Sequence, residues 1–152
     1  MPHKILYTAD LHGNKEYYKK LIAKAKDSEI KAVVIGGDLC PKGGPTVEDA
    51  VKTQKEFLEK FFIPELGKLK KDIFFIMGND DFRINEAILK NANENIKYIN
   101  KKRFNLFNKN IVGYSFVNPT PFRLKDWEKF EDAKKEMPQQ LHDYEIRTVK
   151  KE

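Results

Sequence analysis

The chain has 152 residues and a net charge of +6, with 40% of its residues hydrophobic and 34% charged. This length predicts a single domain, 1–152, built around one core. No run of residues approaches the ~20 apolar positions that a membrane-spanning helix requires, so we expect no membrane partner. A single cysteine, Cys40, and the lack of a signal-peptide pattern at the N-terminus favour a cytoplasmic protein.

The positive charge comes from lysines that are scattered along the chain. Arginine, which binds phosphate groups through two parallel hydrogen bonds, is rare. It occurs only at Arg83, Arg103, Arg123 and Arg147. We therefore interpret the lysines as a solvated surface, and a nucleic-acid partner is disfavoured.

The first two-thirds of the chain alternates between apolar runs and helical patterns. Three short runs lack polar alternation, which is typical of parallel strands that are buried on both faces. They are Lys4–Ala9, Ala32–Ile35 and Ile73–Met77. Apolar residues at spacings of three and four predict helices at 17–25 and 47–62, with Thr46 as an N-cap, and a shorter one at 85–93. Strands that alternate with helices predict a mostly parallel sheet.

After residue 93 the pattern favours short strands separated by turn-forming residues. The strand candidates are Ile96–Ile99, Arg103–Leu106 and Asn110–Tyr114. Prolines at 119 and 121 predict an extended loop, because each keeps its predecessor out of helical geometry. We expect a helix from Asp126 toward Lys135, and the polar tail 137–152 shows no strand pattern.

Each of the three strong strand candidates is followed at once by a polar cluster. The clusters are Asp10-Leu11-His12-Gly13-Asn14, Gly36-Gly37-Asp38 and Gly78-Asn79-Asp80-Asp81. Ligands of open α/β sheets bind beyond the carboxyl ends of the strands, so these clusters are expected to converge. Their glycines allow tight turns that bring the neighbouring side chains inward.

The residue types in these clusters suit divalent metal ions. Asp10 and His12 are two residues apart and can grip one ion, while the two oxygens of Asp38 are enough to bridge two ions. Asn79 offers a neutral amide oxygen. This mixture favours Mn²⁺, Fe or Zn²⁺ over a thiolate-preferring metal. Two such ions can hold a bridging hydroxide that attacks a phosphoester.

The three clusters resemble the Asp-x-His, Gly-Asp and Gly-Asn signature of the calcineurin-like metallophosphoesterases. Segments 112–122 and 125–128 are similar to a bacterial and archaeal subfamily, so the resemblance covers roughly residues 4–130. It implies an α/β fold, a β-sandwich flanked by helices, of which the chain holds mainly the N-terminal half. It also implies hydrolysis of a small-molecule or nucleotide phosphoester, with Asp10 and His12 on one metal ion, Asp38 between two, and Asn79 on the second.

One departure from the family concerns the residue after Gly-Asn. Most members carry a histidine there, which protonates the leaving group or stabilises the transition state, whereas this chain has Asp80. We keep Asp80 as the candidate catalytic residue, acting as an acid if burial raises its pKa or else orienting a water molecule. The change favours substrates with better leaving groups, such as phosphodiesters or anhydrides, over phosphomonoesters. Arg83 and Arg123 are the candidate contacts to the substrate phosphate.

A second departure is that the family's later histidine and Gly-His-x-His block are missing. The only later histidine, His142, lies in a polar stretch and is interpreted as a surface residue. We therefore expect an incomplete second metal site and a domain that is incomplete at its C-terminus. A missing C-terminal half or a homo-oligomer would then cover apolar surface of the sheet. The alternative function is a non-catalytic metal-binding or scaffold protein of the same fold.

Overall fold

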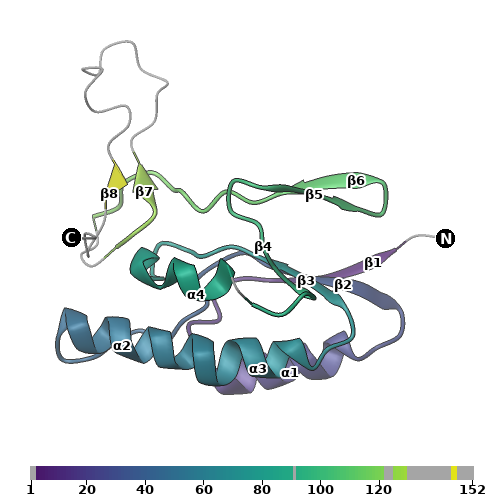
Figure 1. Ribbon diagram of the computed structural model, residues 1–152, viewed down its shortest axis with the longest axis horizontal. Coiled ribbons are helices and arrows are strands. Elements are labelled where there is room, and N and C mark those ends of the chain that lie inside the picture. The colour runs from purple at the N-terminus through teal and green to yellow at the C-terminus, as the bar shows by residue number, and fades with distance from the viewer. Residues whose placement is uncertain (1–2, 91, 122–124, 130–144, 147–152) are drawn as a thin grey trace, which may run out of the picture.

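The computed structural model describes residues 3–90, 92–121, 125–129 and 145–146. Its centre is a four-stranded parallel sheet with the strand order β1-β2-β3-β4, which confirms the predicted α/β class (Figure 1). The strands are β1 Lys4–Thr8, β2 Ile30–Ile35, β3 Asp72–Phe75 and β4 Ile96–Tyr98. All three predicted parallel strands are present, with ends that differ by one or two residues.

The two long helices on one face of the sheet, α1 and α2, begin at side-chain caps. Helix α1, Lys15–Ala25, starts after Asn14, whose side-chain oxygen accepts a hydrogen bond from Glu16 N at 3.0 Å. Helix α2, Val47–Phe57, starts after Thr46, whose hydroxyl accepts one from Asp49 N at 3.1 Å, as predicted. The helical path then continues through the π-helical turn η1, Leu58–Phe62, and helix α3, Ile63–Gly67. The predicted short helix is a 3₁₀ turn η2, Arg83–Asn85, and helix α4, Glu86–Lys90.

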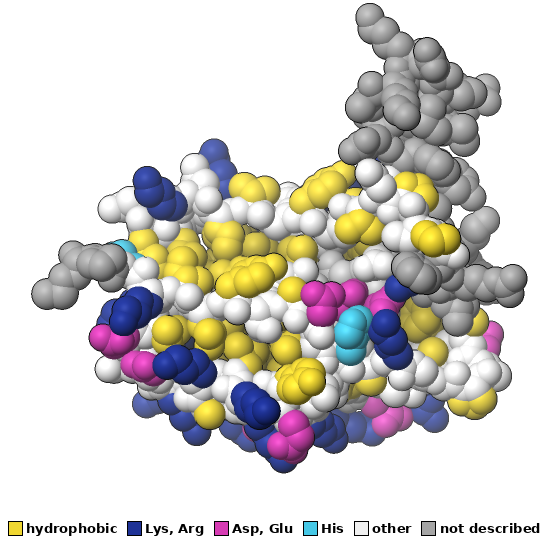
Figure 2. Space-filling view, turned by 180° about the vertical axis from the view of Figure 1, so that it is seen from behind, with side chains coloured by type: hydrophobic (Ala, Val, Ile, Leu, Met, Phe, Trp, Pro, Cys, Tyr) yellow, Lys and Arg dark blue, Asp and Glu magenta, His cyan; other side chains and the backbone are white. Residues whose placement is uncertain are grey.

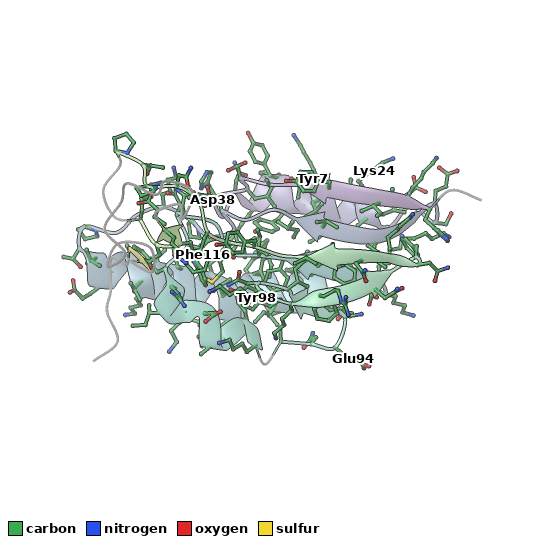
Figure 3. All side chains as sticks on the ribbon, turned by 90° about the horizontal axis from the view of Figure 1, so that it is seen from above. Tyr7, Lys24, Asp38, Glu94, Tyr98 and Phe116 are labelled. Atoms are coloured by element: carbon green, nitrogen blue, oxygen red, sulfur yellow. The ribbon has the colours of Figure 1, made fainter. Side chains whose placement is uncertain are left out.

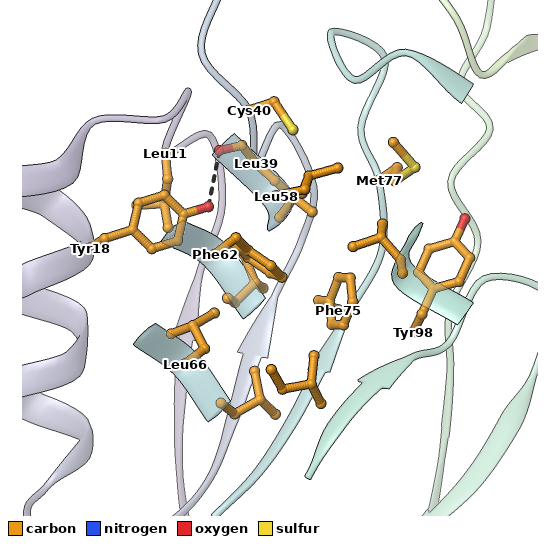
Figure 4. Close-up of a cluster of buried hydrophobic side chains, with 14 of the residues drawn as sticks. Leu11, Tyr18, Leu39, Cys40, Leu58, Phe62, Leu66, Phe75, Met77 and Tyr98 are labelled. Carbon is orange, nitrogen blue, oxygen red and sulfur yellow. Dashed lines mark hydrogen bonds between the residues drawn. The ribbon is translucent and has the colours of Figure 1, made fainter. Parts of the chain in front are cut away.

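Aromatic side chains fasten α1 and the π-helical turn to the sheet. Tyr18, Phe62 and Phe75 are almost fully buried and lie edge to face, with ring centroids 5.9 and 5.1 Å apart. The Tyr18 hydroxyl donates a hydrogen bond to Leu39 O at 3.0 Å (Figure 4). This bond links the core directly to the loop that follows β2.

A β-hairpin lies over the opposite face of the sheet. Strands β5, Arg103–Leu106, and β6, Lys109–Val112, pair antiparallel, and Phe104 packs on Phe74 with ring centroids 5.9 Å apart. The hairpin does not cover β1, and on this strand the side chains of Ile5 and Tyr7 are 45% and 67% exposed. Hydrophobic side chains are visible on this face in Figure 2. The expectation that β1 is buried on both faces is therefore wrong, because β1 is the edge strand.

The predicted helix from Asp126 toward Lys135 is wrong at its start. Glu128–Lys129 is a strand, β7, paired antiparallel with β8, Glu145–Ile146. Trp127 has a φ of 60°, which no helix continues through, and Lys129 N donates to Val117 O at 2.9 Å. Strand β8 also corrects the expectation of a tail without strands, and positions 130–135 lie outside the described residues. Within the described part of the chain, no helix has the length and apolar character needed to cross a membrane.

Candidate metal centre

The loops that follow β1 and β2 are joined by main-chain hydrogen bonds. Asp10 N donates to Gly37 O at 3.1 Å, and His12 N donates to Asp38 O at 2.8 Å. Gly13 N donates to Leu39 O at 2.9 Å. The parallel pairing of the two strands thus extends into their loops, which sets the first two predicted clusters side by side.

The loop after β3 closes on the second loop through a glycine. A Cβ at Gly78 would lie 2.2 Å from Asp38 Oδ1 and 2.3 Å from Asp38 N, so only glycine permits this approach. Asp80 N donates to Asp38 Oδ1 at 2.9 Å. Asp38 therefore lies between the first and third loops, at the end of the sheet away from Glu94 (Figure 3).

Three of the predicted ligands come together at this edge. Asp10, His12 and Asp38 each offer an atom within 4.8 Å of the others'. His12 Nε2 lies 3.9 Å from Asp38 Oδ2, and His12 Nδ1 is buried without a hydrogen-bond partner. Figure 2 shows a histidine grouped with acidic and basic side chains on this surface. Two carboxylates beside an unpartnered buried imidazole nitrogen fit a divalent cation.

The same three residues carry unusual backbone geometry. The φ angles are 56° at Asp10, 44° at His12 and 51° at Asp38. Non-glycine residues adopt this left-handed region rarely, at a cost on the order of 1–3 kcal/mol each, and such residues cluster at functional sites. The loops after β1 and β2 hold these three side chains in one group despite that cost.

The site is electrostatically suited to exchange a proton for a cation. Burial raises the pKa of Asp38 above its ordinary value, the neighbouring Asp10 adds to this, and His12 opposes it. A proton therefore competes with a metal ion for Asp38 at a higher pH than for an exposed carboxyl group. Metal binding is expected to strengthen as the pH rises through this range.

Asp81 connects the second and third loops, a role that the sequence analysis missed. This side chain is fully buried. Its Oδ2 accepts hydrogen bonds from Leu39 N at 2.9 Å and Gly78 N at 2.8 Å, and its Oδ1 accepts one from Cys40 N at 2.8 Å. Burial raises the pKa of Asp81 to about 6, against the lowering effect of the three N–H groups. The only signal was a second acidic residue directly after Asp80.

Gln54 of α2 supports the third loop from the helical side. It is buried, its amide nitrogen donates to Asp80 O at 2.8 Å, and its amide oxygen accepts from Phe82 N at 2.7 Å. Sequence reasoning missed this residue, because a polar residue within an amphipathic helix is normally assigned to the exposed face. Helix α2 therefore positions the loop as well as covering the sheet.

Two lysines surround the predicted catalytic Asp80. Lys42 Nζ lies 2.6 Å from Asp80 Oδ2, and Lys125 Nζ is in contact with Asp80 Oδ1. His12 Nδ1 lies 3.7 Å from Asp80 Oδ2. Two ammonium groups stabilise the ionised carboxylate. The sequence analysis favoured arginines as phosphate contacts and missed both lysines, although Lys42 follows Asp38 by only four residues.

The other predicted site residues are Asn79, Arg83 and Arg123. Asn79 follows Gly78 in the third loop, and its main-chain oxygen accepts a hydrogen bond from Asp126 N at 3.0 Å. The guanidinium carbon of Arg83 lies 4.9 Å from the ring centroid of Trp127, so this side chain packs on an aromatic face. Metal binding by Asn79 and substrate binding by Arg83 stay predictions. Arg123 and His142 lie outside the described residues.

Comparison with known protein families identifies the family to which the chain belongs. A family model described as calcineurin-like phosphoesterase matches residues 3–146. No curated protein and no solved structure matched the chain. The matched range contains all three loops of the candidate metal centre.

We expect Asp81→Ala to lower the free energy of unfolding by about 3 kcal/mol or more. Three buried N–H groups would lose their acceptor, and each unsatisfied group costs about 1–3 kcal/mol. Urea denaturation followed by circular dichroism measures the loss. The control, Asp72→Ala, removes a half-exposed carboxylate paired with Lys97 and is expected to cost less than about 1 kcal/mol. Equal losses in the two variants would contradict the role of Asp81.

Proposed function

Since the chain belongs to the calcineurin-like phosphoesterase family, we propose that it is a metal-dependent hydrolase of phosphoesters. The observation that supports this most directly is the grouping of Asp10, His12 and Asp38 within 4.8 Å at the loop end of the sheet. The unpartnered, buried Nδ1 of His12 supports it as well. A single buried cysteine, Cys40, is compatible with the reducing cytoplasm, where we place the protein.

The residues that would hold metal ions in this proposal are those of the three loops. Asp10 and His12 would hold one ion, Asp38 would be shared with a second ion, and Asn79 would contribute to that second ion. Carboxylate, imidazole and amide donors suit Mn²⁺, Fe or Zn²⁺. When bound, such ions supply Lewis acidity and lower the pKa of a coordinated water molecule, the nucleophile for phosphorus. The protein's part is to fix Asp38, which Asp80 N holds at 2.9 Å.

The surroundings of Asp80 narrow the substrate class that we propose. An ionised carboxylate between Lys42 and Lys125 has no proton to give to a leaving group. Esters with an acidic alcohol leave without a proton, whereas alkyl monophosphates need one. We therefore propose a phosphodiester with a good leaving group as substrate. Asp80 then acts by positioning the two lysines and not as a general acid.

The ligand count leaves a second function open. Among the described residues, the first ion would receive three protein ligands and the second Asp38 and Asn79, fewer than a closed two-metal site requires. Additional ligands from a second copy of the chain or from a C-terminal half would complete an active enzyme. Without them, the same residues form a non-catalytic metal-binding or scaffold protein.

We expect wild-type protein to bind Mn²⁺ and Asp38→Asn to bind it at least tenfold more weakly, because the shared carboxylate loses its charge. Even groups that only support a ligand change metal affinity by about 10–100-fold. Isothermal titration calorimetry at pH 8 measures both proteins. Asp72→Asn, a half-exposed aspartate at the start of β3, is the control and should bind like wild type. Equal affinities for wild type and Asp38→Asn would reject the assignment.

A second expectation concerns the substrate. In the presence of Mn²⁺, bis(4-nitrophenyl) phosphate should be hydrolysed at least tenfold faster than glycerol 3-phosphate, since only the latter needs a protonated leaving group. Release of nitrophenol and of inorganic phosphate gives the two rates. A preference for glycerol 3-phosphate would contradict the role given to Asp80. Mn²⁺ binding without hydrolysis of either compound would favour the metal-binding protein.

A further inference from the structure

A cavity opens directly beside the candidate metal centre. It has a volume of about 590 Å³ and lies between residues 42–46, the N-terminal part of α2, and Lys125. Asp80 and Phe82 of the third loop form part of its wall. This volume is within the range of about 300–1,000 Å³ that is typical of small-molecule sites. Asp80 connects the cavity to the metal centre, because it lines the cavity and its main-chain N–H donates to Asp38 Oδ1 at 2.9 Å.

Two ammonium groups lie at the end of the cavity at Asp80. Lys42 and Lys125 both contact this carboxylate, so on the described cavity wall two positive charges accompany one negative charge. The Lys125 side chain is only 12% exposed, against 64% for Lys42, so its charge is less screened by water. An anionic group at this end is attracted by the two lysines from the cavity side.

The rest of the cavity wall is apolar or already hydrogen-bonded. Pro45, Val47, Ala50 and Phe82 contribute hydrocarbon surface. Both ends of the Gln54 amide are engaged with the third loop. Among the described lining residues, Asp80 is the one carboxylate. The wall therefore favours an uncharged, apolar group over a charged or sugar-like one.

We propose that this cavity binds the organic part of the substrate, and that Lys42 and Lys125 bind its phosphate oxygens. The substrates are then phosphoesters of aryl or similarly apolar alcohols. The inference rests on the proposed function, because it requires the phosphate to lie between the lysines and the metal ligands Asp10, His12 and Asp38.

Phenylphosphonate and methylphosphonate test the inference, because they share one anionic group and are not hydrolysed. Calorimetry should show that phenylphosphonate binds at least tenfold more tightly than methylphosphonate, both with and without Mn²⁺. Ala50→Phe fills the cavity and should bring the two affinities together. Val47→Phe is the second blocking variant in case Ala50→Phe does not fold, which circular dichroism checks. Ala23→Phe adds the same ring at an exposed position of α1 and should keep the preference.

The lysines give an independent result. Lys125→Gln should weaken the binding of both phosphonates at least tenfold. Lys42→Gln should weaken it less, because the Lys42 side chain is more exposed than that of Lys125. Equal affinity for the two phosphonates, or a preference that survives both blocking variants, would overturn the cavity assignment. Unchanged affinities in both lysine variants would overturn the phosphate contacts. If Mn²⁺ does not bind, the proposed function is wrong. The phosphonate titrations without Mn²⁺ would still test whether the cavity binds the phenyl group.

Discussion

The carboxylate of Asp81 accepts hydrogen bonds from Leu39 N, Cys40 N and Gly78 N, and the arrangement of the candidate site depends on this contact. The loops after β2 and β3 would otherwise each carry unpaired main-chain donors in a buried place. With the contact made, Gly78 lies against Asp38, and the third loop reaches the first two. Asp81 thus organises the site although it is not one of the proposed metal ligands.

The site balances unfavourable features against the binding of a cation. Asp10, His12 and Asp38 hold left-handed φ angles, His12 Nδ1 is buried without a partner, and burial raises the pKa of Asp38. Each of these features opposes folding of the metal-free chain. A divalent ion would be a partner for the imidazole and both carboxylates at once, so its binding would offset these costs. This explains why the sequence keeps strained residues at the loop end of a well-packed sheet.

The strands, the caps and the three polar loops could be predicted because their signals are local. Apolar runs marked β1 to β3, and Thr46 before a helical pattern marked α2. Gln54 and Asp81 could not be predicted, since their roles depend on partners that include residues 26 and 42 positions away. The helix expected from Asp126 failed for a similar reason, because pairing with Val117 outweighs local helix preference. The exposure of β1 depends on where the β5–β6 hairpin lies over the sheet, and the spacing of apolar residues along β1 does not encode that position.

The central claim is that one ion lies among Asp10, His12 and Asp38, and paramagnetic broadening by Mn²⁺ tests it directly. In ¹H–¹⁵N spectra, a substoichiometric amount of Mn²⁺ broadens amide signals only near the bound ion. The account predicts selective loss of the signals of residues 10–14, 36–40 and 78–81, all from the three loops. His3, which directly precedes β1 and stacks on Phe107 of the β5–β6 turn, should keep its signal. Broadening centred on His3, or spread evenly over the exposed acidic residues, would contradict the claim.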